Sequence, residues 1–124
     1  MKKVINVGII SKEDYRKRTI AIAKGEYTPR KNEPKVWFES LNAMAQTLNS
    51  ENQALLRVIL EKKPASLAEL EAMTGRRKSN LSRTLKTLER YGVVQLNQQG
   101  KRLVPKVAAT DFKVEFGLNY GHAA

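Results

Sequence analysis

Residues 66–94 read SLAELEAMTGRRKSNLSRTLKTLERYGVV, and this stretch decides the fold. Ser66 with Glu69 three residues later is a capping box, which predicts a short helix whose apolar side is Leu67, Leu70 and Met73. The pair Thr74-Gly75 predicts a turn. A longer helix is expected from about Arg77 to Tyr91, with Gly92 as its stop. The stretch therefore predicts two helices joined by a short turn.

The longer helix has two opposite faces. At about 100° per residue, Leu81, Leu85 and Leu88 lie within about 60° of one another, so they are predicted to face the core. The opposite side carries Ser79, Arg83, Lys86 and Arg90. A helix held by three leucines would present these polar, mainly cationic side chains to solvent.

The pattern changes after Gly92, where the apolar period falls from about 3.6 to 2. Two predicted strands, Val93–Leu96 and Arg102–Val107, flank Asn97–Gly100 and indicate a hairpin. Phe112–Phe116 alternates in the same way and is expected to be a last strand. The order of short helix, turn, longer helix and hairpin is that of a helix-turn-helix with a wing.

The N-terminal part is expected to form a separate arm. Residues Lys3–Ile10 predict a strand, Ser11 is expected to cap a helix that continues to about Lys24, and the proline-containing stretch 26–34 is interpreted as a linker. Trp37 and Phe38 open the main domain, with apolar residues at helical spacing to Leu48. A next helix is expected from Ser50, with Gln53 completing a capping box. The prediction is an α+β fold: a strand–helix arm (1–35), a winged helix-turn-helix domain (36–118) and a flexible tail (119–124).

The charge of the chain predicts a polyanionic partner. Its 124 residues include 23 Lys and Arg against 12 Asp and Glu, for a net charge of +11 at pH 7. Such an excess in a small protein is typical of nucleic-acid binding. The length is that of one compact domain with at most a short appendage.

The composition leaves little for catalysis. The chain has no cysteine, and its one histidine is His122. Thiolate zinc sites and cysteine nucleophiles are therefore excluded, and a lone histidine near a terminus is more often solvated than a ligand. We expect no enzyme activity, no metal and no cofactor. No apolar run approaches the length of a membrane span and the N-terminus has no signal-peptide cleavage pattern, so we expect no membrane contact and a cytoplasmic protein.

Geometry assigns expected roles on double-stranded DNA. Residues near the start of the recognition helix reach base edges, so Ser79, Asn80 and Arg83 are the predicted base readers. The predicted backbone contacts are Arg76, Arg77, Lys78, Lys86 and Arg90, with Ser66 and Thr84 as possible neutral donors. Lys101 and Arg102, just past the hairpin turn, are expected to reach the adjacent minor groove or backbone.

The stretches 67–75 and 78–94 resemble the winged helix-turn-helix of MarR-type and related prokaryotic transcriptional regulators. More narrowly, Val7-Gly8, Arg18, the stretches 22–27 and 33–38, and residues 50–52 resemble small bacterial and archaeal DNA-binding proteins often described as antitoxins. That resemblance spans about residues 7–107. It implies sequence-specific DNA binding, repression of the protein's own operon and a toxin partner. The chain lacks the long C-terminal dimerisation helix of full-length MarR proteins.

Three functions remain open from the sequence. The first is a homodimeric DNA-binding regulator with half-sites roughly 34 Å apart, whose dimer contact is the N-terminal strand–helix or the strand 112–116. The second is an antitoxin that neutralises a co-encoded toxin through the arm. The third is a basic RNA-associated protein, which the lack of an aromatic stacking platform disfavours.

Overall fold

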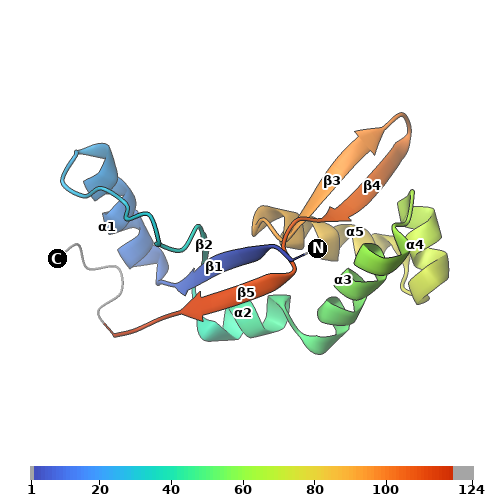
Figure 1. Cartoon of the computed structure of the whole chain (residues 1–124), viewed down its shortest axis with the longest axis horizontal. Coiled ribbons are helices and arrows are strands. Elements are labelled where there is room, and N and C mark those ends of the chain that lie inside the picture. Colours follow the sequence, from blue (N-terminus) through green and yellow to red (C-terminus); the bar gives the residue numbers. More distant parts are fainter. Residues whose placement is uncertain (1, 119–124) are drawn as a thin grey trace. The chain divides into compact units, whose positions relative to one another are not determined.

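The computed structural model describes residues 2–118, which form two compact units (Figure 1). Unit 1 comprises Met1–Lys3 and Gln46–Thr110, and unit 2 comprises Val4–Ala45 and Asp111–Ala124. The tail expected at 119–124, with His122, lies outside the described residues. The helices and strands give an α+β architecture, as the sequence predicted.

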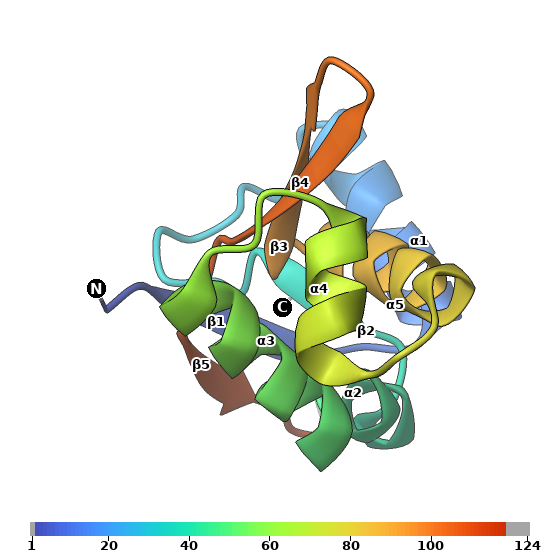
Figure 2. The same cartoon turned by 90° about the vertical axis from the view of Figure 1, so that its right-hand side faces the viewer.

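Unit 1 contains three helices followed by a two-stranded antiparallel hairpin. The helices are α3 (Ser50–Lys62), α4 (Leu67–Thr74) and α5 (Lys78–Arg90), and the hairpin pairs β3 (Val94–Gln99) with β4 (Arg102–Val107). Figures 1 and 2 both show the tip of the hairpin extending away from the three helices. Unit 1 is thus a helical core that bears one projecting strand pair.

The predicted apolar face of α5 is confirmed. Leu81, Leu85 and Leu88 are each 0% exposed, and Val93 and Val94 directly after the helix are almost as deeply buried. Burying a leucine side chain stabilises the fold by about 1.5–3 kcal/mol. The three leucines therefore fix which side of α5 can face solvent.

The helix termini of unit 1 follow their capping residues. Ser66 caps α4 as expected, because its Oγ accepts from the Glu69 backbone N–H at 3.1 Å. The expected start of α3 at Ser50 is confirmed, but Ser50 is not the N-cap of the helix. Asn49 is the cap, and its Oδ1 accepts from the backbone N–H of Asn52 at 2.8 Å. Asparagine is at least as good an N-cap residue as serine, which explains why the cap lies one residue before Ser50.

The hairpin is longer than expected. Asn97–Gly100 was expected to be the loop, but Asn97 pairs with Val104, and β3 continues to Gln99, which pairs with Arg102. The turn is reduced to two residues, Gly100 and Lys101, and Gly100 has the positive φ of 63° that such tight turns need. Polar side chains did not end the strand, because Asn97, Gln98 and Gln99 remain exposed to solvent while their backbone pairs with β4.

Unit 2 is a parallel sheet with one helix in its first connection. Its elements are β1 (Val4–Ile9), α1 (Lys12–Ala23), β2 (Val36–Phe38) and β5 (Asp111–Glu115), with strand order β2-β1-β5. All pairs are parallel, and β1-α1-β2 is a strand–helix–strand crossover. The short helix α2 (Leu41–Thr47) follows β2.

Several expectations for this part of the chain differ from the structure. The strand, the helix and its Ser11 cap are confirmed. Trp37 and Phe38 do not open the main domain: they lie in β2 of unit 2 and pair with Gly8 and Ile9. The division at residues 35 and 36 also differs from the observed units, since residues 36–45 and β5 group with β1. Parallel pairing joins segments distant in sequence, which local periodicity does not reveal.

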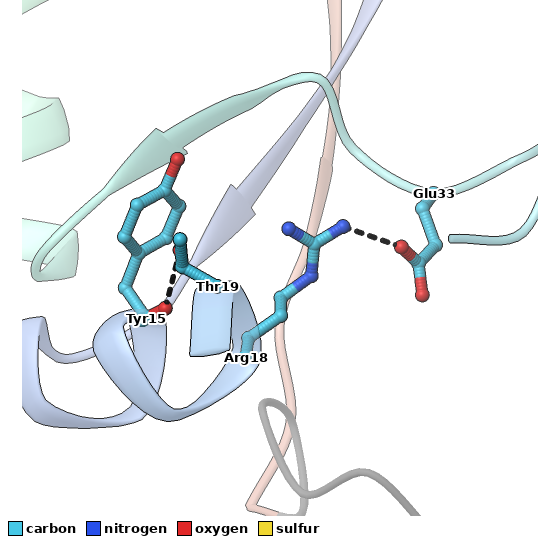
Figure 3. A network of polar contacts seen from close by, with 4 residues as sticks. All are labelled: Tyr15, Arg18, Thr19 and Glu33. Carbon is cyan, nitrogen blue, oxygen red and sulfur yellow. Dashed lines mark hydrogen bonds and ion pairs between the residues drawn. The ribbon is translucent and has the colours of Figure 1, made fainter. Parts of the chain in front are cut away.

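The proline-containing stretch is held at its two ends, where Tyr27 and Glu33 are half-buried and Pro34 is buried, whereas residues 28–32 are exposed. Glu33 Oε2 accepts from Arg18 Nη2 at 2.7 Å, and both side chains are only 14% exposed (Figure 3). The Arg18 guanidinium also lies 5.0 Å from the ring centre of Trp37 and 5.9 Å from that of Tyr27. These contacts tie α1 to the segment that leads into β2.

Strand β1 is the middle strand of this sheet. It pairs with β2 on one side and β5 on the other. Two segments that were expected to contact a second copy, β1 and the strand at 112–116, therefore pair with each other within the chain. No helix among the described residues is long and apolar enough to cross a membrane.

Gly8 is expected to be intolerant of a side chain. A Cβ at this position would lie 2.5 and 2.6 Å from ring carbons of Trp37 and 2.9 Å from Pro34 Cγ. Gly8→Ala should lower the free energy of unfolding by about 1–3 kcal/mol, because a packed ring cannot move aside freely. Gly117→Ala is the control, since nothing lies within 4 Å of its added Cβ. Equal denaturant midpoints for the two variants would refute this packing account.

Candidate nucleic-acid interface

The positive charge of the chain is concentrated in unit 1. Its residues carry 14 Lys and Arg against 5 Asp and Glu, a net charge of +9, whereas unit 2 carries 9 against 7, a net charge of +2. Unit 2 contains the ion pairs Lys12–Glu39, Lys17–Glu13 and Arg18–Glu33. The cations of unit 1 are therefore not neutralised by salt bridges within its described part.

The outer face of α5 is exposed as the sequence predicted. Ser79, Arg83, Lys86 and Arg90 are all exposed, on the side opposite the buried leucines. The Arg90 guanidinium lies 5.6 Å from the ring centre of Tyr91, a cation–π contact at the end of the helix. This face forms a continuous polar stripe with three cations.

The start of α5 has a cap that sequence reasoning missed. The N-cap residue Arg77 makes no side-chain cap hydrogen bond. Instead Glu71 Oε2, from α4, accepts from the backbone N–H of Lys78 at 2.8 Å. The carboxylate also offsets the unfavourable placement of three cations at the positive end of the helix dipole. A search for local caps misses it because Glu71 lies seven residues away, across the turn.

Arg76 differs from Arg77 and Lys78 in its hydrogen bonds and its burial. Its guanidinium donates to Asn80 Oδ1 from Nε at 3.0 Å and from Nη2 at 2.8 Å, and to Thr84 Oγ1 from Nη2 at 3.1 Å. Nη1 donates to Asn52 Oδ1 on α3 at 3.3 Å. Arg76 is half-buried, whereas Arg77 and Lys78 are exposed. The structure thus joins two predicted site residues, Arg76 and Asn80, and adds Asn52, which was not a predicted site residue.

The same arginine lies beside an open depression of about 770 Å³ within unit 1. It is lined by residues of α3, of the end of α4 and of the start of α5. The apolar lining residues are Ala54, Leu55, Val58 and Met73, and the polar ones are Glu51, Thr74, Arg76, Arg77 and Asn80. No group of three or more His, Asp or Glu that could hold a metal occurs among residues 2–118.

The two cations of the hairpin lie where the strands turn. Lys101 is in the two-residue turn and Arg102 opens β4, and both are exposed. The side chain of Gln98 donates from Nε2 to the Gly100 carbonyl at 2.9 Å, which holds the turn from the β3 side. Of the expected neutral donors, Thr84 accepts from Arg76 and Ser66 caps α4.

A family model described as HVO_A0114 matches residues 47–114. The chain belongs to the HVO_A0114 family. The match covers more than half of the 124 residues, including every element of unit 1 and most of β5. No curated protein and no solved structure matches the chain.

Removal of the Glu71 cap tests how α5 is held at its start. Glu71→Ala should lower the free energy of unfolding by about 1 kcal/mol, the usual cost of losing a helix cap. Glu61→Ala removes an exposed carboxylate near the end of α3 and should change stability by less than about 0.5 kcal/mol. Urea denaturation of both variants measures the difference. A Glu71→Ala variant as stable as Glu61→Ala would mean that this hydrogen bond does not support α5.

Proposed function

We propose that this member of the HVO_A0114 family is a sequence-specific double-stranded DNA-binding transcriptional regulator of the winged helix-turn-helix class. In this proposal α4 and α5 form the helix-turn-helix, α5 enters the major groove, and the β3–β4 hairpin is the wing. It is a repressor of its own operon and has no catalytic role.

The observation that supports the proposal most strongly is that the buried leucine face and the exposed basic face lie on opposite sides of α5. Its three core leucines are fully buried, and Arg83, Lys86 and Arg90 therefore face outward. A DNA-reading helix needs this arrangement, because its backbone is held by the protein core while its free face meets the groove. The unpaired charge of unit 1 supplies the attraction to phosphates.

Roles within the interface follow from position along α5. Ser79, Asn80 and Arg83 lie in its first two turns, from which side chains reach base edges. Arg83 is the strongest candidate for a guanine contact, since its guanidinium can donate two parallel hydrogen bonds to O6 and N7. Arg77, Lys78, Lys86 and Arg90 are proposed phosphate contacts. Arg102 and Lys101 on the wing are proposed to contact the adjacent backbone or minor groove.

We further propose that the regulator acts as a homodimer on a two-fold site. Of the two expected contact segments, β1 is paired on both sides, whereas β5 is an edge strand of the sheet within the described residues. Val114 in β5 and Phe116 just after its end are 43% and 59% exposed. This apolar edge favours β5 as the contact with a second copy.

Selection from a pool of randomised DNA duplexes tests the proposal without knowledge of the operator. The full chain should enrich one motif and bind it at least about a thousandfold more tightly than scrambled duplex. Arg83→Ala should reduce that preference by roughly five- to hundredfold, because it removes a base contact. Arg102→Ala should weaken binding to all duplexes alike. It should also lower the salt slope, which is the slope of the logarithm of the binding constant against the logarithm of the salt concentration, by about one unit.

Two results would contradict the proposal. One is failure to enrich any motif, with equal binding to duplex DNA and to RNA of the same length; this would favour general electrostatic or RNA binding. The other is a preference that Arg83→Ala leaves intact, which would show that α5 does not read the motif.

A further inference from the structure

The hydrogen bonds of Arg76 leave it little capacity for a phosphate. An arginine has five side-chain N–H donors, and the side chain of Arg76 makes four hydrogen bonds, to Asn80, Thr84 and Asn52. Bidentate capture of a phosphate needs two parallel N–H groups on one side of the guanidinium. Arg77, next in the chain, is exposed and has no such bonds among the described residues. Arg76 is therefore poorly suited to the backbone role that the sequence predicted for it.

The same bonds change what Asn80 can offer a partner. Its Oδ1 accepts two hydrogen bonds, from Nε and from Nη2 of Arg76. A carbonyl oxygen has two lone pairs, so both acceptor positions of the Asn80 amide are occupied. The Nδ2 group retains its two N–H donors. Asn80, which is exposed on the third residue of α5, is thus a hydrogen-bond donor toward solvent.

We infer that Arg76 is a positioning residue that makes Asn80 a donor-only reader, so that Asn80 selects guanine rather than adenine. Asparagine normally recognises adenine by accepting from N6 with its oxygen while donating to N7. With its oxygen occupied, it cannot accept from N6. Guanine presents two acceptors, N7 and O6, to the major groove, whereas cytosine presents only a donor. This inference rests on the proposed function and corrects the adenine contact that an unrestrained asparagine would make.

The central experiment is duplex selection with the native chain, Asn80→Ala, Arg76→Met and Arg77→Met. The base position whose preference disappears in Asn80→Ala identifies the base that Asn80 reads. At that position the native chain should prefer guanine over adenine. Arg76→Met frees the Asn80 oxygen, and the preference should move toward adenine by roughly five- to hundredfold.

Arg77→Met is the matched control, because it removes the same charge from the adjacent residue without touching Asn80. It should keep the guanine preference and lower the salt slope by about one unit, as a lost phosphate contact does. Arg76→Met should change the base preference and leave the salt slope nearly unchanged. The two arginines should therefore separate into a positioning residue and a phosphate contact.

A second measurement needs no DNA. The side-chain NH2 signals of Asn80 in the NMR spectrum of the full chain should indicate an ordered amide. In Arg76→Met they should move to averaged positions, whereas Thr84→Val, which removes one of the bonds to Arg76, should shift them less. Unchanged Asn80 signals in a folded Arg76→Met variant would overturn the inference.

Failure of the inference can be told from failure of the proposed function. If the native chain enriches no motif, the proposed function is wrong and the inference falls with it. If it enriches a motif but prefers adenine at the Asn80 position, or if Arg76→Met only lowers the salt slope, the inference alone is overturned. In that case Arg76 is a phosphate contact and the regulator remains.

Discussion

The burial of Leu81, Leu85 and Leu88 is the interaction on which the proposed interface depends. Because all three are fully enclosed, α5 has one rotation about its axis that the core accepts. That rotation turns Arg83, Lys86 and Arg90 outward, and it sets Asn80 and Thr84 beside Arg76. The chemistry of the surface is thus a consequence of apolar packing beneath it. If α5 could rotate about its axis, its charged side chains would have no defined arrangement toward a binding partner.

The polar contacts at the start of α5 add a second level of order. Glu71 holds the first turn through a backbone N–H, and Arg76 holds a side chain three residues into the helix. In both contacts a charged side chain holds a nearby group of the same chain, so it is not free to bind a partner. Exposed cations such as Arg83 and Arg102 hold no other group by a side-chain hydrogen bond within the described residues. This division explains how a small, strongly basic surface can include both rigid and available groups.

The local structure of unit 1 was predictable from the sequence, because it follows from period and caps over short distances. The two faces of α5 and the Ser66 cap needed only neighbouring residues, and both are confirmed. The role expected for Arg76 was based on its charge at the start of the helix, and the sequence could not show that Asn52 on α3 and Thr84 would accept hydrogen bonds from it. Unit 2 was less predictable, since its parallel strands come from both ends of the chain. Gly8, Arg18, Glu33 and Trp37, which carried the narrower family resemblance, prove to be partners in its packing.

The most direct test of the central claim is residue-by-residue NMR mapping of the full chain during titration with the selected duplex. Backbone amide shifts should change most along the outer face of α5, from Ser79 to Arg90, and at Gly100–Arg102 of the hairpin. Helix α1 in unit 2, which carries Arg16 and Lys17, supplies an internal comparison and should change little. Changes centred on α1, or spread evenly over every exposed lysine and arginine, would contradict the account. Such a result would mean that the charge of the chain, and not the orientation of α5, governs binding.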